Sequence, residues 1–121
     1  MNNDPLYKEI ILENWEHPMN YGTLKHSDVD VIEQNPLCGD EIRLMISFDN
    51  DQIAKIRFTA QGCAIAKASA SLTTEAIKGM SKKDLENMKP EDVLEELGIS
   101  LTPARTKCAL LIYQTIKKIT D

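Results

Sequence analysis

Three cysteines in three separate motifs are the residues of this sequence best suited to chemistry. Cys38 occurs in the string NPLCGD, Cys63 in GCAIA and Cys108 in RTKC. An odd number of cysteines in a chain without an export signal is a poor basis for a disulfide framework. Three thiols and the carboxylate of Asp40 instead make four ligands, enough for a tetrahedral metal or an iron–sulfur cluster. The sequence therefore indicates a metal–sulfur site.

Each of these residues also has a plainer structural interpretation. A lone cysteine is often a small buried apolar side chain, and this applies best to Cys108, which falls on an apolar helical stripe. Asp40 follows a glycine and is consistent with a simple cap at the start of a strand. Arg105 and Lys107, the cations near Cys108, are consistent with a solvated helix surface. Because 24 and 44 residues separate successive cysteines, their spacing alone does not prove that they meet.

The composition limits the class of protein. A length of 121 residues fits a single domain, and we draw no boundary within 1–121. The net charge of −5 and the scattered basic residues argue against a nucleic-acid surface. No window approaches the ~20 apolar residues needed to cross a bilayer, so no membrane association is expected. The N-terminus does not resemble a signal peptide, so we expect a cytoplasmic protein whose thiols stay reduced.

The pattern of apolar residues predicts an α+β fold. The first helix carries Ile10, Ile11 and Trp15 at helical spacing, and we expect Trp15 to pack in the core. The turn at 49–51 joins two alternating segments into an antiparallel hairpin. We therefore expect a small antiparallel three-stranded sheet with helices packed on one face. The predicted strands lie at 29–33, 42–48 and 55–60, and the predicted helices at 6–16, 64–78, 90–97, a short one beginning at 81, and one last helix beginning at Thr102-Pro103.

These elements place the cysteines at positions that suit a thiolate. Cys38 lies in a loop just before a strand, and Cys63 lies between a strand and a helix. At a helix start, free backbone N–H groups and the helix dipole favour a thiolate. Cys108 lies on the last helix, beside Lys107. We expect the loop, the helix start and the helix face to meet at one end of the sheet.

The three motifs, in this order, resemble the IscU/SufU family of iron–sulfur cluster assembly proteins, also found as the N-terminal domain of NifU. The string at 35–40 fits the family's NPxCGD motif, 62–71 fits GCxxxxASAS, and 103–110 fits the third cysteine motif. Tyr7 and the segment 17–22 resemble the family's N-terminal pattern. The resemblance therefore runs nearly from end to end.

The resemblance implies a carrier rather than a catalyst: a scaffold that builds a transient [2Fe–2S] cluster and passes it to apo iron–sulfur recipient proteins. Sulfur would come as persulfide from a cysteine desulfurase, with iron and electrons from other donor proteins. Cys38, Cys63 and Cys108 would be the cluster ligands, and Asp40 the acidic residue at the site. Because a carboxylate is a harder donor than a thiolate, Asp40 would hold the cluster less firmly than a fourth cysteine.

Two branches of the family are mixed in this chain. IscU proteins have a histidine before the third cysteine and an LPPVK-like stretch ahead of it. Here Lys107 stands in place of the histidine, and residues 101–105 read LTPAR, which argues against recognition by the specialised Hsp70 chaperone. The RTKC and ASAS strings resemble SufU, whereas the stretch between Cys63 and Cys108 is too short for the insertion typical of SufU.

An alternative function follows from the SufU-like features. In a zinc-bound sulfur acceptor, a sulfurtransferase partner of the desulfurase, Zn²⁺ would be held by Cys38, Asp40, Cys63 and Cys108. Cys108 is then the candidate persulfide acceptor, with Arg105 and Lys107 helping to hold its thiolate in the charged form. A purely structural zinc module fits less well, because structural sites usually draw paired cysteines from short knuckles.

Overall fold

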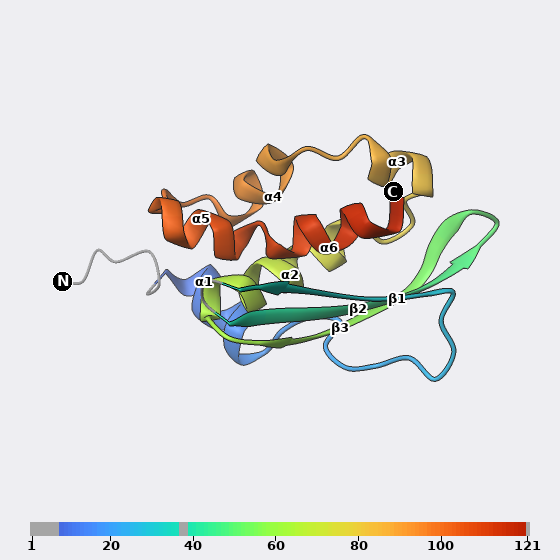
Figure 1. The fold of residues 1–121 in the computed structure, drawn as a ribbon, viewed down its shortest axis with the longest axis horizontal. Coiled ribbons are helices and arrows are strands. Elements are labelled where there is room, and N and C mark those ends of the chain that lie inside the picture. The colour runs from blue at the N-terminus through green and yellow to red at the C-terminus, as the bar shows by residue number, and fades with distance from the viewer. Residues whose placement is uncertain (1–7, 37–38, 121) are drawn as a thin grey trace.

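A computed structural model describes residues 8–36 and 39–120 of the chain (Figure 1). Among the described residues, no helix is long and apolar enough to cross a membrane. The elements, in chain order, are α1 (Glu9–Glu16), β1 (Val29–Asn35), β2 (Asp40–Asp49), β3 (Gln52–Gln61), α2 (Ala64–Ala76), α3 (Lys82–Glu86), α4 (Pro90–Leu97), α5 (Pro103–Ala109) and α6 (Leu111–Thr120).

The three strands form one antiparallel sheet in the order β1-β2-β3. In the register, Asn35 lies opposite Asp40 and Ile42 lies opposite Ala60. The predicted turn between β2 and β3 is present, and Asn50 and Asp51 adopt left-handed φ angles of 52° and 67°. Asparagine and aspartate tolerate this conformation better than most residues. The predicted hairpin and the predicted three-stranded sheet are therefore confirmed.

Helices α2 and α6 cover one face of the sheet, as Figure 1 shows in its edge-on view. Alternate residues of β2 and β3 point to this face and are fully buried, among them Leu44, Ile46 and Phe58. They pack against apolar side chains of α2 and α6, including Ile112 and Ile116. Burial of each large apolar side chain contributes roughly 1.5–3 kcal/mol, so this layer is the main source of stability. The expected one-sided α+β packing is confirmed.

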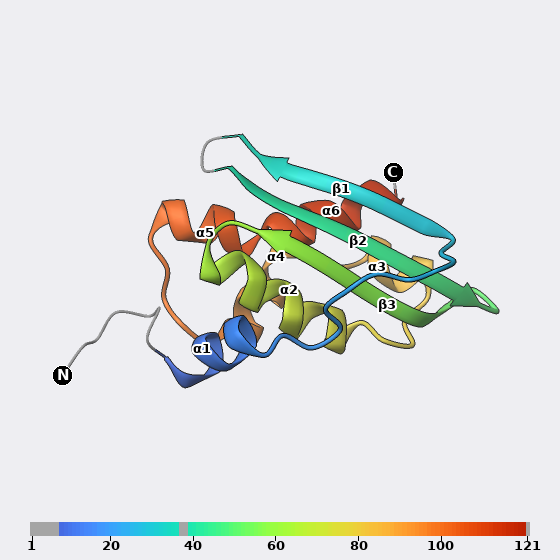
Figure 2. The same cartoon turned by 90° about the horizontal axis from the view of Figure 1, so that it is seen from below.

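The connection between α1 and β1 runs along the opposite face of the sheet (Figure 2). The N–H of Gly22 donates to the carbonyl of Phe58 at 2.8 Å, and the N–H of Phe58 donates to the carbonyl of Asn20 at 2.9 Å. The ring of Tyr21 meets the ring of Phe58 edge to face, with centroids 5.3 Å apart. This segment therefore pairs with the outer edge of β3 before it crosses to β1.

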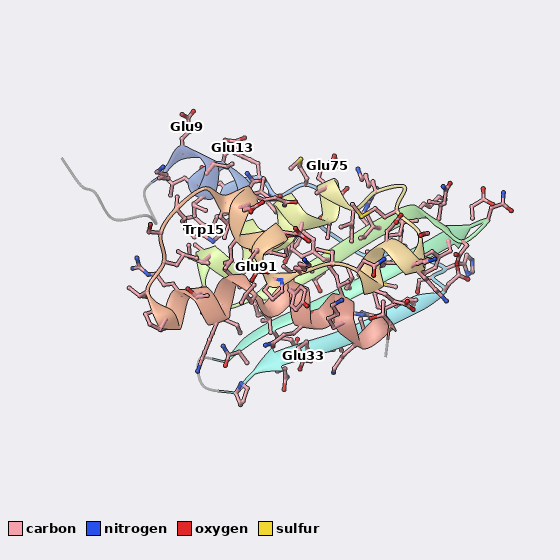
Figure 3. The ribbon with its side chains drawn as sticks, turned by 90° about the horizontal axis from the view of Figure 1, so that it is seen from above. Glu9, Glu13, Trp15, Glu33, Glu75 and Glu91 are labelled. Atoms are coloured by element: carbon pink, nitrogen blue, oxygen red, sulfur yellow. The ribbon has the colours of Figure 1, made fainter. Side chains whose placement is uncertain are left out.

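The packing of α1 corrects one prediction from the sequence. Trp15 is 42% exposed rather than buried in the core. Figure 3 labels this residue, which belongs to α1. The face of α1 that turns inward carries Ile11 and Asn14, and Asn14 Oδ1 accepts a hydrogen bond of 2.7 Å from the Ser71 hydroxyl. Apolar spacing predicted the helix but not its buried face, which combines the apolar Ile11 with a polar contact to α2.

The last helix is also different from the prediction. A single helix was expected from Thr102-Pro103 onward, but α5 ends at Ala109, and α6 begins at Leu111. The carbonyl of Ala109 accepts a hydrogen bond from the Ser69 hydroxyl of α2. A side chain that bonds to a helix carbonyl from outside can draw it away from the regular ladder and interrupt the helix.

Candidate metal centre

Three chain segments meet at the end of the sheet where β1 finishes and β2 begins (Figures 1 and 2). They contribute Asp40 from the start of β2, Cys63 from the N-cap position of α2, and Cys108 from α5. One potential ligand atom of each lies within 4.8 Å of the others. The structure therefore brings together three of the four residues that the sequence indicated. Cys38, the fourth, lies outside the described residues.

Asp40 is tied directly to the backbone of Cys63. Its side chain is buried, and its Oδ1 atom accepts a hydrogen bond of 2.9 Å from the N–H of Cys63. This bond joins the start of β2 to the start of α2 and fixes the orientation of the carboxylate. Asp40 is thus more than a local strand cap, because its partner lies 23 residues farther along the chain.

Gly62 makes room for the Asp40 side chain, and this role was not predicted from the sequence. Its φ angle is +118°, a region that residues with a side chain rarely adopt. A Cβ atom at Gly62 would lie 2.7 Å from Cγ and 2.9 Å from Cα of Asp40. Only glycine therefore allows the Asp40 carboxylate to approach Cys63 in this way. The position of this glycine, directly before the candidate ligand Cys63, is the sequence signal that could have indicated this role.

The thiol of Cys63 has a raised pKa in the metal-free protein. Burial is the main cause, and the nearby carboxylate of Asp40 raises the pKa further. The backbone N–H groups of Ala66 and Ile65 and the thiol of Cys108 act in the opposite direction. The expected effect of the helix start is present, but burial outweighs it. A bound metal cation would reverse this balance, because it favours the thiolate.

Cys108 is both a buried residue of an apolar cluster and a candidate metal ligand. It is 8% exposed and belongs to an apolar cluster with Ile11, Ile65 and Ala109, as the apolar stripe predicted. Its sulfur nevertheless lies within 4.8 Å of the candidate ligand atoms of Cys63 and Asp40. The apolar surroundings limit the access of water on this side of the site.

The two cations near Cys108 occupy different environments. Lys107 is exposed and lines a hollow of about 280 Å³ with Gln34, Asn35, Pro36 and Gln114. Asn35 is the register partner of Asp40, so this hollow adjoins the site. Arg105 is partly buried, and its backbone N–H donates to the hydroxyl of Thr102 at 3.3 Å.

The donor set fits a thiophilic metal or an iron–sulfur cluster. Two thiols can supply soft thiolate ligands and Asp40 a harder oxygen ligand, a combination that Zn²⁺ and iron–sulfur chemistry both accept. Oxygen-selective ions such as Mg²⁺ and Ca²⁺ fit poorly, because they prefer sites built from oxygen ligands.

Comparison with known proteins identifies the family. The profile of the NifU-like N-terminal domain matches residues 6–120. The chain belongs to this family. The resemblance inferred from the three cysteine motifs is therefore confirmed, and it covers almost the whole sequence.

Relatives from both branches match the chain at similar identity. The zinc-dependent sulfurtransferase SufU of Bacillus subtilis is 39% identical over 97% of this chain and 90% of its own length. The iron–sulfur cluster assembly scaffold protein IscU of Escherichia coli is 35% identical over 92% of this chain and 88% of its own length. A solved structure described as an iron–sulfur cluster assembly scaffold for the SUF system of Fervidobacterium islandicum matches with a TM-score of 0.81 and 25% identity.

The lengths of these relatives bear on the choice between branches. The alignment with the Bacillus SufU spans 134 residues, more than the 121 of this chain, so that relative carries residues with no counterpart here. The Fervidobacterium protein, in contrast, is covered over 98% of its chain by 97% of this one. A protein described as part of a SUF system can therefore have the shorter length, and length alone does not assign the branch.

Proposed function

We propose that this protein is a scaffold on which a transient [2Fe–2S] cluster is assembled and from which it is transferred. The observation that carries the proposal is the convergence of Asp40, Cys63 and Cys108 within 4.8 Å at one end of the sheet. Cys38, from the motif that contains Asp40, completes the ligand set by resemblance. The IscU relative, named as a scaffold protein, supports the same function.

The mixed set of thiolate and carboxylate ligands suits a cluster that must be released to another protein. Thiolates bind iron firmly, whereas the carboxylate of Asp40 is a harder donor that exchanges more readily with water or with an incoming ligand. Asp40 is therefore the weak position in the set. The cluster is cargo of this protein, and recipient apoproteins would take it by offering thiolates of their own.

Sulfur would reach the site as persulfide from a cysteine desulfurase. A thiolate of this chain attacks the outer sulfur of the desulfurase persulfide, takes up that sulfur, and releases the desulfurase thiolate. We propose Cys108 as the acceptor, with Arg105 and Lys107 near it as sources of positive charge. Because Cys108 is only 8% exposed, delivery to it requires α5 to move or a ligand to exchange. The partner surface would surround this end of the sheet, where the desulfurase must approach.

A second function is favoured by a specific observation. The Bacillus relative is named as a zinc-dependent sulfurtransferase, and the Arg105-x-Lys107-Cys108 string resembles that branch. In this function Zn²⁺ would occupy Cys38, Asp40, Cys63 and Cys108 and hold their sulfurs as thiolates. The protein would then accept sulfur from the desulfurase without building a cluster.

One experiment separates the two functions. The protein is incubated without oxygen with ferrous iron, cysteine, a cysteine desulfurase and a thiol reductant that converts persulfide sulfur to sulfide, and visible absorption is followed before and after an apo-ferredoxin is added. A cluster that forms near stoichiometrically and moves to the ferredoxin supports the scaffold. If no cluster forms, and zinc-loaded protein accelerates the desulfurase in a way that Cys108→Ala abolishes, the sulfur acceptor is the function. The variant Lys78→Ala, changed at an exposed position just after α2, is the control.

A further inference from the structure

A buried hydrogen bond joins the two helices α2 and α5, which position Cys63 and Cys108. The hydroxyl of Ser69, on α2, donates to the carbonyl of Ala109 at 2.7 Å. Ser69 is 1% exposed and Ala109 is fully buried, so water cannot readily replace either partner. A hydrogen bond of this kind is costly to break, because each group would then be buried without a partner.

The position of this bond relates it to the metal centre. Ala109 directly follows Cys108 and closes α5, and Leu110 interrupts the helix before α6 begins. Ser69 lies on the same rigid helix as the Cys63 N-cap. The bond therefore sets the position of α5 along α2, and with it the distance between the two sulfurs.

Other hydroxyls of α2 have different roles. Ser71 donates to Asn14 of α1, and Thr74 donates to the carbonyl of Ser71 within its own helix. Thr73 Oγ1 is buried with no hydrogen-bond partner among the described residues. The fold therefore leaves one hydroxyl of this helix unpaired and directs another toward α1. The bond from Ser69 to the residue after Cys108 is a specific feature of this packing.

We propose that Ser69 is a positioning residue for the metal centre. Its hydroxyl holds the carbonyl of Ala109 and thereby keeps the sulfur of Cys108 in ligand geometry with Cys63 and Asp40. Sites of this kind need their ligands held within about 0.5 Å, and loss of a supporting hydrogen bond typically costs roughly 10–100-fold in metal affinity. The inference rests on the proposed metal site.

The test compares Ser69→Ala with Ser71→Ala. Both variants remove a buried hydroxyl from α2, but only the first removes a bond that reaches the residue next to Cys108. Three quantities are measured on the full chain: the dissociation constant for Zn²⁺ by chelator competition, the visible absorption of the Co²⁺-loaded protein, and the free energy of unfolding without metal. Co²⁺ absorption reports the number and geometry of the ligands, which a purely structural role of Ser69 would not change.

We expect Ser69→Ala to raise the dissociation constant for Zn²⁺ about tenfold or more and to weaken and shift the Co²⁺–thiolate bands. Ser71→Ala should lose stability and keep the parent's affinity and spectrum. Equal affinity and spectra in the two variants would overturn the proposal.

Ser69→Thr is a second test, because it keeps the hydroxyl. This variant should show the Co²⁺ spectrum of the parent protein, even where Ser69→Ala folds poorly. A Thr variant with the spectrum of the Ala variant would also overturn the proposal. Failure of the parent itself to bind Zn²⁺ or Co²⁺ would instead count against the proposed site.

Discussion

The Cγ atom of Asp40 lies 2.7 Å from the point that a Cβ atom would occupy at Gly62. The residue before Cys63 must therefore be glycine if the Asp40 carboxylate is to accept the N–H of Cys63. Asp40 and Gly62 belong to motifs that are separated in the sequence. The contact needs the carboxylate from the first motif and the missing side chain of Gly62 from the second. This contact leads to the first of four predictions.

Gly62→Ala should displace Asp40 and weaken metal binding. The substitution brings a strained positive φ, which costs roughly 1–2 kcal/mol, together with the collision with Asp40. We expect a lower free energy of unfolding in urea and a higher dissociation constant for Zn²⁺. Gly22→Ala is the matched control, because Gly22 has a φ of +132° with no atom within 4 Å of the added Cβ. If Gly22→Ala weakened Zn²⁺ binding as much, the contact with Asp40 would not be the cause.

Asp40→Ala should give a cluster that persists longer and transfers more slowly. The substitution removes the harder oxygen ligand, the position at which water or a recipient's thiolate enters most readily. The measurement is the anaerobic decay of visible absorption, with and without apo-ferredoxin. Asp40→Asn keeps an oxygen that can accept the N–H of Cys63, so it separates the lost charge from the lost hydrogen bond. Equal or faster cluster loss in Asp40→Ala would remove this role for the carboxylate.

Asn14→Ala should loosen α1 from the rest of the protein. Asn14 Oδ1 accepts from the Ser71 hydroxyl at 2.7 Å, and both side chains are buried. The Ser71 oxygen still accepts the N–H of Met19, but the buried hydroxyl hydrogen of Ser71 loses its acceptor, which costs about 1–3 kcal/mol. We expect lower stability in urea and faster hydrogen exchange of the α1 amides. The exposed neighbour Glu13→Ala should change neither quantity appreciably, and an equal effect in both variants would show that the buried contact is unimportant.

Glu96→Gln should stabilise the protein at high pH and not at low pH. Burial, together with the smaller effect of the negative charge of Asp92, raises the pKa of Glu96 to about 7. The folded state therefore prefers the protonated carboxyl. Its contribution to stability is complete below the usual pKa of 4.5 and is lost as pH rises through about 7. Glutamine mimics the protonated form at every pH.

The expected gain at pH values above about 7 is on the order of 1 kcal/mol, because partial exposure of Glu96 reduces the full linkage energy. The measurement is urea unfolding of metal-free protein across this pH range, with the exposed Glu95→Gln as control. A gain of the same size below pH 4.5 would contradict the titration of Glu96 as its source.

Local features of the sequence were the most predictable. The helix Pro90–Leu97 was predicted with its observed bounds, because proline suits the first helical position and Gly98 adopts the left-handed φ of 63° that ends it. The short helix α3 is held by a capping box between Ser81 and Asp84, three residues apart. Such signals act over a few residues, so they can be read without knowledge of the fold.

Errors arose where a distant contact decided the outcome. Trp15 has the spacing of a buried residue, but α1 turns Ile11 and Asn14 inward, where Ile11 packs in an apolar cluster and Asn14 accepts a hydrogen bond from Ser71. The interruption at Leu110 coincides with a hydrogen bond from Ser69 to Ala109, forty positions away in the chain. Periodicity gives the faces of a helix, but it does not give the neighbour that covers each face.

By itself, the sequence determined the family, the candidate donor residues and the order of the sheet and its helices. These follow from the chemistry of thiol and carboxylate groups and from interactions between residues close along the chain. Only the tertiary structure decided that Asp40, Cys63 and Cys108 lie within 4.8 Å, that Gly62 must lack a side chain, and that Ser69 joins the two cysteine-bearing helices. Each of these depends on residues far apart in sequence, whose separation is fixed by the packing of the helices on the sheet.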